Sequence, residues 1–136
     1  MFEVNKEWLE KLRENMHLLR QIAGYSDTNF GKLLGCSRQT ISNIESRNSR
    51  LSIMQYLAID RVFEELRKEN KLLDHAVCIL LDSEEISEQE KEWFTNDIYA
   101  AIGKFGRCNR HKTPMDLSLY LQEQFKEVTQ NAKEVY

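Results

Sequence analysis

The chain has 136 residues, of which 41% are hydrophobic, and a formal net charge of −3. This length allows one or two small domains, and the net charge by itself argues against a nucleic-acid-binding protein. The charge is divided unevenly, however: residues 1–72 carry twelve Lys/Arg against ten Asp/Glu, whereas residues 73–136 carry seven against twelve. If the protein binds nucleic acid, this uneven charge predicts that only residues 1–72 contact it.

The cysteines and the lengths of the apolar segments indicate in which cellular compartment the protein is expected. Cys36, Cys78 and Cys108 show no paired spacing, which favours a reduced, cytoplasmic protein over a disulfide-bonded one. No N-terminal run resembles a signal peptide, and no apolar stretch approaches the ~20 residues that span a bilayer. We therefore expect no membrane partner.

The whole chain reads as helical, with no strand alternation and no internal repeat. Asn5 is a plausible cap for a first helix that should end at Gly24, because glycine readily takes the left-handed conformation of a helix C-terminus. The apolar residues of this helix recur at spacings of three and four: Trp8, Leu9, Leu12, Met16, Leu19 and Ile22.

The most informative segment is residues 24–46, GYSDTNFGKLLGCSRQTISNIES, which encodes two short helices joined by a tight turn. The first should end at Gly35, and the hydroxyl of Ser37 should cap the second. Ile41 and Ile44 then face inward. The opposite, polar face of the second helix carries Gln39, Ser42, Asn43 and Ser46. A helix with such a face suits the major groove of DNA, where base edges present donors and acceptors.

The second half continues with helices. After a polar loop at residues 47–50, Ser52 can cap a helix that starts at Ile53. Residues 53–81 contain no Gly or Pro, so they form one long helix or two with a bend near Asn70. Residues 82–85 form an acidic break, and Ser87 with Glu90 has the form of a capping box.

Two further helices are predicted near the C-terminus. The first carries an apolar stripe of Phe94, Ile98, Ala101, Ile102 and Phe105. Residues 106–112 form a basic loop, after which Thr113 and Pro114 start the last helix. The stripe of that last helix is Leu117, Tyr120, Leu121, Phe125 and Val128.

The stretch from about Leu19 to Leu57 resembles the helix-turn-helix of the phage Cro and repressor proteins, the XRE-type family of bacterial regulators. The residues at family positions are Arg20, Gly24, Phe30, Leu34, Gly35, Ser37, Ile41, Ile44 and Glu45. The resemblance covers well under half of the chain. It implies an all-α fold with a lambda-repressor-like helix-turn-helix domain at residues 1–72, followed by additional C-terminal helices at residues 73–136.

The resemblance also implies roles for individual residues. The first helix of the motif would brace the DNA backbone, and the second, residues 38–46, would enter the major groove. Base-contacting positions would be Arg38, Gln39, Thr40 and Asn43, and backbone-contacting positions would be Ser37, Ser46, Arg47, Asn48 and Arg50. Arg20 would pair with Glu45 inside the domain. Two residues depart from the family pattern: Gly31 replaces the usual Ala, and Asp27 replaces a Gln that bonds a phosphate.

Three of the four base-contacting residues have a plainer alternative. Arg38 could donate to guanine O6 and N7, or simply contact a phosphate, and both interpretations stay open. The amides of Gln39 and Asn43 match adenine, and their alternative is a solvated helix face. Thr40 could place its methyl against thymine.

Other chemistry finds little support. Cys108 and His111 have ligand-like spacing, but four zinc ligands are not nearby. The acidic residues of the second half resemble a solvated face: Glu84, Glu85, Glu88, Glu90 and Glu92. We expect no catalytic residues, no metal and no cofactor.

The sequence therefore predicts a DNA-binding transcriptional regulator, most often a repressor in this family, that binds double-stranded DNA as a homodimer. Aromatic residues of the C-terminal half could form the dimer contact, cover the preceding helix, or bind a partner protein. The competing function is an antitoxin-like or adaptor module that binds DNA weakly, a reading favoured by Asp27 and the acidic balance.

Overall fold

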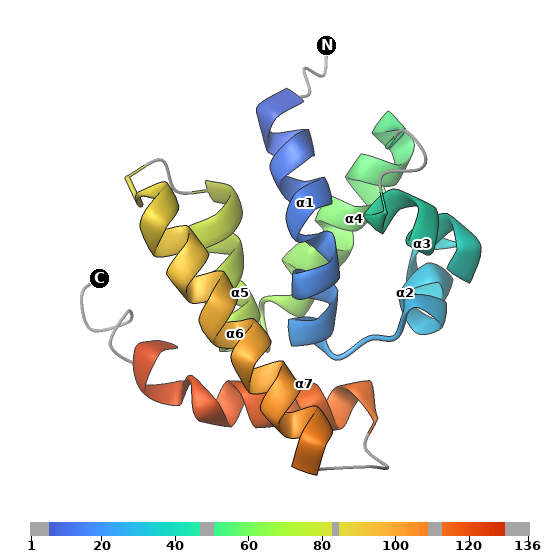
Figure 1. Ribbon diagram of the computed structural model, residues 1–136. Helices are drawn as coiled ribbons and strands as arrows, with labels where there is room; N and C mark the ends of the chain where they lie inside the picture. The colour runs from blue at the N-terminus through green and yellow to red at the C-terminus, as the bar shows by residue number, and fades with distance from the viewer. Residues whose placement is uncertain (1–5, 47–50, 83–84, 109–112, 130–136) are drawn as a thin grey trace.

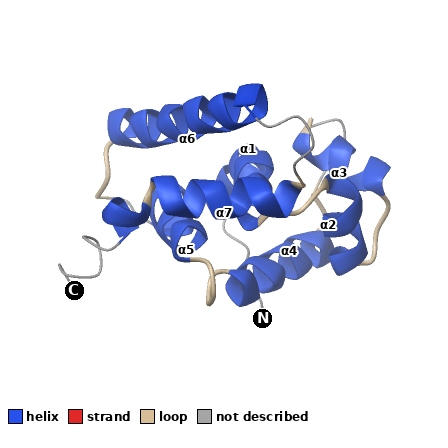
Figure 2. Ribbon diagram, turned by 90° about the horizontal axis from the view of Figure 1, so that it is seen from below, coloured by secondary structure: helices blue, strands red, loops and turns tan. Residues whose placement is uncertain are grey.

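The fold is described from a computed structural model, in which residues 6–46, 51–82, 85–108 and 113–129 are placed. These residues form helices joined by short connections and include no strand (Figures 1 and 2). The all-α fold predicted from the periodicity is thus confirmed for this part of the chain. None of its helices combines the length and the apolar character needed to cross a membrane.

The helices follow one another in the order predicted. They are α1 (Lys6–Ala23), α2 (Asp27–Leu34), α3 (Arg38–Glu45), α4 (Ile53–Leu66), α5 (Lys71–Val77), a π-helical turn η1 (Cys78–Asp82), α6 (Glu88–Cys108) and α7 (Pro114–Gln124).

Several predicted helix ends are confirmed. α1 ends before Gly24, and the proposed cap Asn5 lies outside the described residues. Ser52 caps α4 in a capping box with Gln55. The chain breaks after α4, and Asn70 caps α5, so residues 53–81 form two helices followed by η1.

The predicted start of α7 is also confirmed, whereas the predicted end of α6 is wrong. Thr113 caps α7 in a second capping box, with Pro114 in the first turn. The basic loop expected at residues 106–112 starts later, because α6 continues through Gly106 to Cys108. The ring of Phe105 packs on Tyr120, with centroids 5.1 Å apart. This contact holds the last turn of α6 and offsets the low helix propensity of Gly106.

A single cluster of buried side chains includes both halves of the chain. α1 contributes the largest share, and Figure 1 shows this helix between α2–α3 on one side and α6 on the other. The side chains of Met16, Ile44, Ile98 and Leu121, from four different helices, are all 0% exposed. The boundary expected between residues 72 and 73 falls within α5, and the helices beyond it complete the same core.

The apolar stripe predicted for the last helix is correct except at its end. Leu121 is fully buried, and Leu117, Tyr120 and Phe125 pack against the core. Val128 is 44% exposed and lies outside α7, which ends at Gln124; it belongs to a further helical turn that follows Phe125.

A buried polar contact joins α1, α5 and α7. The Asn70 side chain accepts from the Leu73 amide at 3.0 Å and donates to the Ile22 carbonyl at 3.0 Å. The Ser118 hydroxyl donates to the same carbonyl and accepts from the Asn70 amide at 3.4 Å. Helix C-termini leave carbonyls without intrahelical partners, so these two side chains satisfy the end of α1.

We expect Asn70→Ala to lower the free energy of unfolding by about 1–3 kcal/mol, because it removes both the cap of α5 and the hydrogen bond to Ile22. Asn70→Ser is the matched control, since serine keeps a capping oxygen but cannot reach as far. Urea unfolding of the three proteins measures the difference. A loss for Asn70→Ser as large as that for Asn70→Ala would show that the cap contributes little.

Candidate nucleic-acid interface

The two helices of residues 24–46 are built by local capping. Ser26 caps α2, accepting from the Asn29 amide at 3.1 Å, and Ser37 caps α3, accepting from the Thr40 amide at 3.2 Å. Gly35 takes the predicted left-handed conformation at φ 73°, and the next amide, that of Cys36, donates to the Gly31 carbonyl at 2.8 Å. These contacts hold α3 in a defined orientation against α2.

The structure explains why position 31 is a glycine. A β-carbon there would lie 2.7 Å from the carbonyl oxygen of Cys36, which is backbone and cannot swing aside. The turn between α2 and α3 therefore approaches α2 more closely than an alanine would allow. This close approach offsets the roughly 1 kcal/mol of helix propensity that glycine costs.

α3 has the two faces predicted from its sequence. Ile41 and Ile44 are 0% exposed and belong to the core. Arg38, Gln39, Ser42 and Ser46 are exposed, while Thr40 and Asn43 are half-buried. The face that points away from the core thus carries only hydrogen-bonding side chains.

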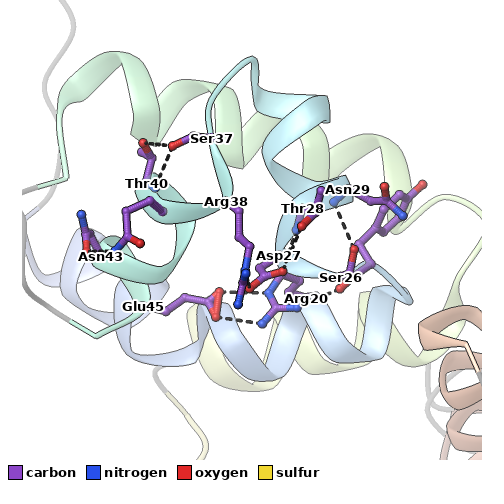
Figure 3. Close-up of polar contacts among 12 residues, drawn as sticks. Arg20, Ser26, Asp27, Thr28, Asn29, Ser37, Arg38, Thr40, Asn43 and Glu45 are labelled. Atoms are coloured by element: carbon purple, nitrogen blue, oxygen red, sulfur yellow. Dashed lines mark hydrogen bonds and ion pairs between the residues drawn. The ribbon is translucent and has the colours of Figure 1, made fainter.

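Asp27 and Arg38 form an ion pair at one end of this face. The Arg38 Nε donates to the Asp27 Oδ2 at 3.1 Å, and the Thr28 amide donates to Oδ1 at 2.7 Å (Figure 3). The hydrogen bond from Arg38 is the main reason that the pKa of the Asp27 carboxyl lies below its usual value. Asp27 is therefore a paired carboxylate, and the Arg38 guanidinium reduces the repulsion that its negative charge would exert on a DNA phosphate.

The polar side chains of α3 also bond one another. The Gln39 Nε2 donates to the Asn43 Oδ1 at 2.9 Å, across one helical turn. The hydroxyls of Ser37 and Thr40 lie 3.0 Å apart, in hydrogen-bond contact. Four of the residues predicted to contact DNA thus form two hydrogen-bonded pairs, which limits the conformations of the exposed face.

Arg20 and Glu45 form the pair that the family resemblance implies, and it ties α1 to α3. The Arg20 Nε and Nη2 donate to the two carboxylate oxygens of Glu45 at 2.9 and 3.0 Å. Both side chains are 11% exposed. Arg20 also donates to the Tyr25 carbonyl at 2.9 Å, and the His17 ring lies 2.9 Å from Glu45. Burial alone would raise the pKa of Glu45, but hydrogen bonds from His17 and Arg20 outweigh it, so this pKa is lowered.

Sequence reasoning missed two contributions from α1. His17 joins the Arg20–Glu45 pair, and the Arg13 Nε donates to the Ile44 carbonyl at 3.4 Å near the end of α3. Both residues lie on the same face of α1 as Arg20, at spacings of three and seven. That periodicity was the one signal in the sequence that could have identified them.

Only two of the five residues predicted to contact the DNA backbone lie in the described part of the chain. Ser46 is exposed at the end of α3, where its amide donates to the Ser42 carbonyl at 2.9 Å. Ser37 is exposed and serves as the cap of α3. The predictions for Arg47, Asn48 and Arg50 fall outside the described residues.

No family model, no curated protein and no solved structure was found to match this chain. What the structure defines is an all-α protein with a short, rigidly held helix that exposes a polar face.

Proposed function

We propose that this protein is a sequence-specific transcriptional regulator that inserts α3 into the major groove of double-stranded DNA. The observation that carries the proposal is the exposed, hydrogen-bonding face of α3, held in place by the Arg20–Glu45 pair and the turn at Gly35. The major groove is about 12 Å wide, which admits an α-helix with its side chains.

The side chains of α3 match the chemistry of base edges. Arg38 uses its Nε for Asp27 and keeps its terminal nitrogens, which can donate to guanine O6 and N7 or to a phosphate. The amides of Gln39 and Asn43 can exchange their mutual hydrogen bond for contacts to adenine N6 and N7. The bond between the two amides in the free protein lowers the entropy cost of ordering them on DNA.

The remaining parts of the proposal rest on the family resemblance. α1 to α4 would correspond to a lambda-repressor-like helix-turn-helix domain of the XRE type, and the protein would act as a repressor in the cytoplasm. Binding as a homodimer would place two copies of α3 on half-sites about 34 Å apart.

A second candidate is an antitoxin-like or adaptor module with weak DNA binding. The observation that favours it is the Asp27–Arg38 pair, because Asp27 neutralises part of the positive charge on the exposed face of α2 and α3. Non-specific DNA affinity comes largely from positive charge, so this module would bind DNA with a shallow dependence on salt.

The test is selection of duplexes from a random library, followed by titration of the preferred duplex at several salt concentrations. We expect Gln39→Ala and Asn43→Ala to relax base preference, each by about 1–3 kcal/mol at one position, with little change in folding. Gln89→Ala, which removes an exposed glutamine from α6, should leave both affinity and preference unchanged.

Two outcomes would contradict the proposal. If selection enriched no sequence, the function would not be sequence-specific DNA binding, and the adaptor would become the better candidate. If a preferred duplex were found and Gln39→Ala left its preference intact, α3 would not be the helix that reads the bases.

A further inference from the structure

The outer face of α6, which points away from the core, carries exposed side chains. Its inner face is used within the chain, where Ile98 is fully buried and Phe94 packs against the core. On the outer face, Trp93 is 59% exposed. The exposed residues of this outer face recur at spacings of three and four: Trp93, Asn96, Ala100, Gly103 and Arg107. These residues form a straight seam along the helix, which is mixed in character: Trp93 and Ala100 are apolar, whereas Asn96 and Arg107 are polar.

The charges beside this seam are segregated along the helix. The acidic residues lie in its first half, at Glu88, Glu90, Glu92 and Asp97, and the basic residues of its last turns are Lys104 and Arg107. The one basic residue of the first half, Lys91, is half-buried and pairs with Glu88 at 3.6 Å. Asp97 and Lys104 are on the same side of the helix but seven residues apart, about 10.5 Å of rise, so they cannot pair with each other. Within the described ranges, no residue forms an ion pair with Asp97, Lys104 or Arg107.

We infer that α6 packs antiparallel against α6 of a second copy of this chain, with the two-fold axis near Ala100. This arrangement places Asp97 opposite the partner subunit's Lys104, and Lys104 opposite the partner subunit's Asp97, within one residue of rise. It also places the ring of Trp93 against the partner subunit's Arg107, where a cation–π contact forms. A parallel pair would instead place acid against acid and base against base.

The short side chain of Ala100 at the axis allows the two helices to approach closely. The contact from Trp93 to Arg107 extends over about 21 Å, which is short for a dimer interface, so a weak, salt-sensitive dimer is expected. A two-fold contact uses the same surface on both copies and closes without forming fibres.

Two aromatic residues of α7 that could have formed the dimer contact pack within the chain instead. The ring of Tyr120 packs at a tilt against Phe105, and Phe125, which follows α7 directly, packs against the core. The α6 face also contains no residue of α2 or α3, which lie on the other side of α1 in Figure 1. The inference deepens the proposed function, since a two-fold dimer presents two copies of α3, but it can be measured without DNA.

Charge reversal in the full chain tests the pairing by sedimentation equilibrium at low salt. We expect Asp97→Lys and Lys104→Glu each to raise the dimer dissociation constant about tenfold, because each substitution faces like charges twice per dimer. The double variant should return to within about threefold of the original value. Glu10→Lys and Lys126→Glu change the net charge equally at exposed positions on α1 and beyond α7, and should leave the constant unchanged.

Disulfide cross-linking locates the axis independently. In a chain whose three natural cysteines are replaced by serine, Ala100→Cys should form a covalent dimer on mild oxidation. Asn96 is also exposed, but the two-fold axis separates the two copies of Asn96→Cys by about 12 Å along the helices, beyond the reach of a disulfide.

The inference would be overturned if the full chain remained monomeric at roughly 100 µM, a concentration above the dissociation constant expected for a specific dimer. So would a double charge variant that is no better than the single ones, or equal cross-linking by Ala100→Cys and Asn96→Cys. Titration of a single half-site duplex separates this inference from the proposed function. If the original full chain is monomeric but still binds the half-site, the pairing alone is contradicted. If it forms the dimer but does not bind DNA, the proposed function alone is contradicted.

Discussion

Replacing Arg20 by methionine is expected to lower the free energy of unfolding by about 3–5 kcal/mol, because it leaves the Glu45 carboxylate largely buried without its main partner. Both side chains are 11% exposed, so water compensates little for the lost contact. Arg20→Met also removes the hydrogen bond to the Tyr25 carbonyl, which orders the connection between α1 and α2.

The comparison that isolates the pair is a double-mutant cycle of Arg20→Met, Glu45→Leu and both together, followed by urea unfolding. Each single change strands a charge, whereas the double change leaves two apolar side chains that can pack together. We expect the double variant to be close to the original protein in stability. Small, additive losses would show that the pair is effectively solvated.

The pH dependence of stability gives a second readout of the same pair. Because the pKa of Glu45 is lowered on folding, its contribution to stability is fully present above its ordinary pKa of 4.5 and is lost as the pH falls through the folded-state pKa. The original protein should therefore lose more stability below pH 4.5 than Glu45→Gln does. Equal slopes in that range would contradict the assignment.

The second large effect is expected for Gly24→Ala, at about 2–5 kcal/mol of unfolding free energy. Gly24 has φ 87°, and a left-handed alanine costs about 1–2 kcal/mol. The added β-carbon would also lie 2.9 Å from the Cβ of Ser118 and 3.2 Å from the sulfur of Met115. α7 must then shift away from α1, which adds an overpacking cost of about 1–3 kcal/mol.

Gly35→Ala is the matched control for this prediction. Gly35 has a similar conformation, φ 73°, but a β-carbon there would meet no atom within 4 Å. Its substitution should cost only the conformational term of about 1–2 kcal/mol. Equal losses for the two variants in urea unfolding would mean that α7 does not press against Gly24.

The local features of this protein were determined by its sequence. The caps at Ser37 and Ser52, the start of the last helix at Thr113 and Pro114, and the left-handed turn at Gly35 were all predicted, and all are present. The reason is that a cap acts over three or four residues, and an amphipathic pattern repeats over the same distance. Both can be recognised without knowing what the helix packs against.

The tertiary structure alone decided which faces meet. Asn70 and Ser118 converge on the carbonyl of Ile22 from 48 and 96 residues away, and Asp27 reaches Arg38 across the turn. Helical periodicity shows which face of a helix is apolar, but not which other helix that face packs against. Most helices of this chain have an apolar face with the same spacing, so the spacing does not distinguish one partner from another. The partial burial of Tyr120 and Phe125 and the exposure of the outer face of α6 both follow from that choice of partners, which depends on how all the helices fill one core together.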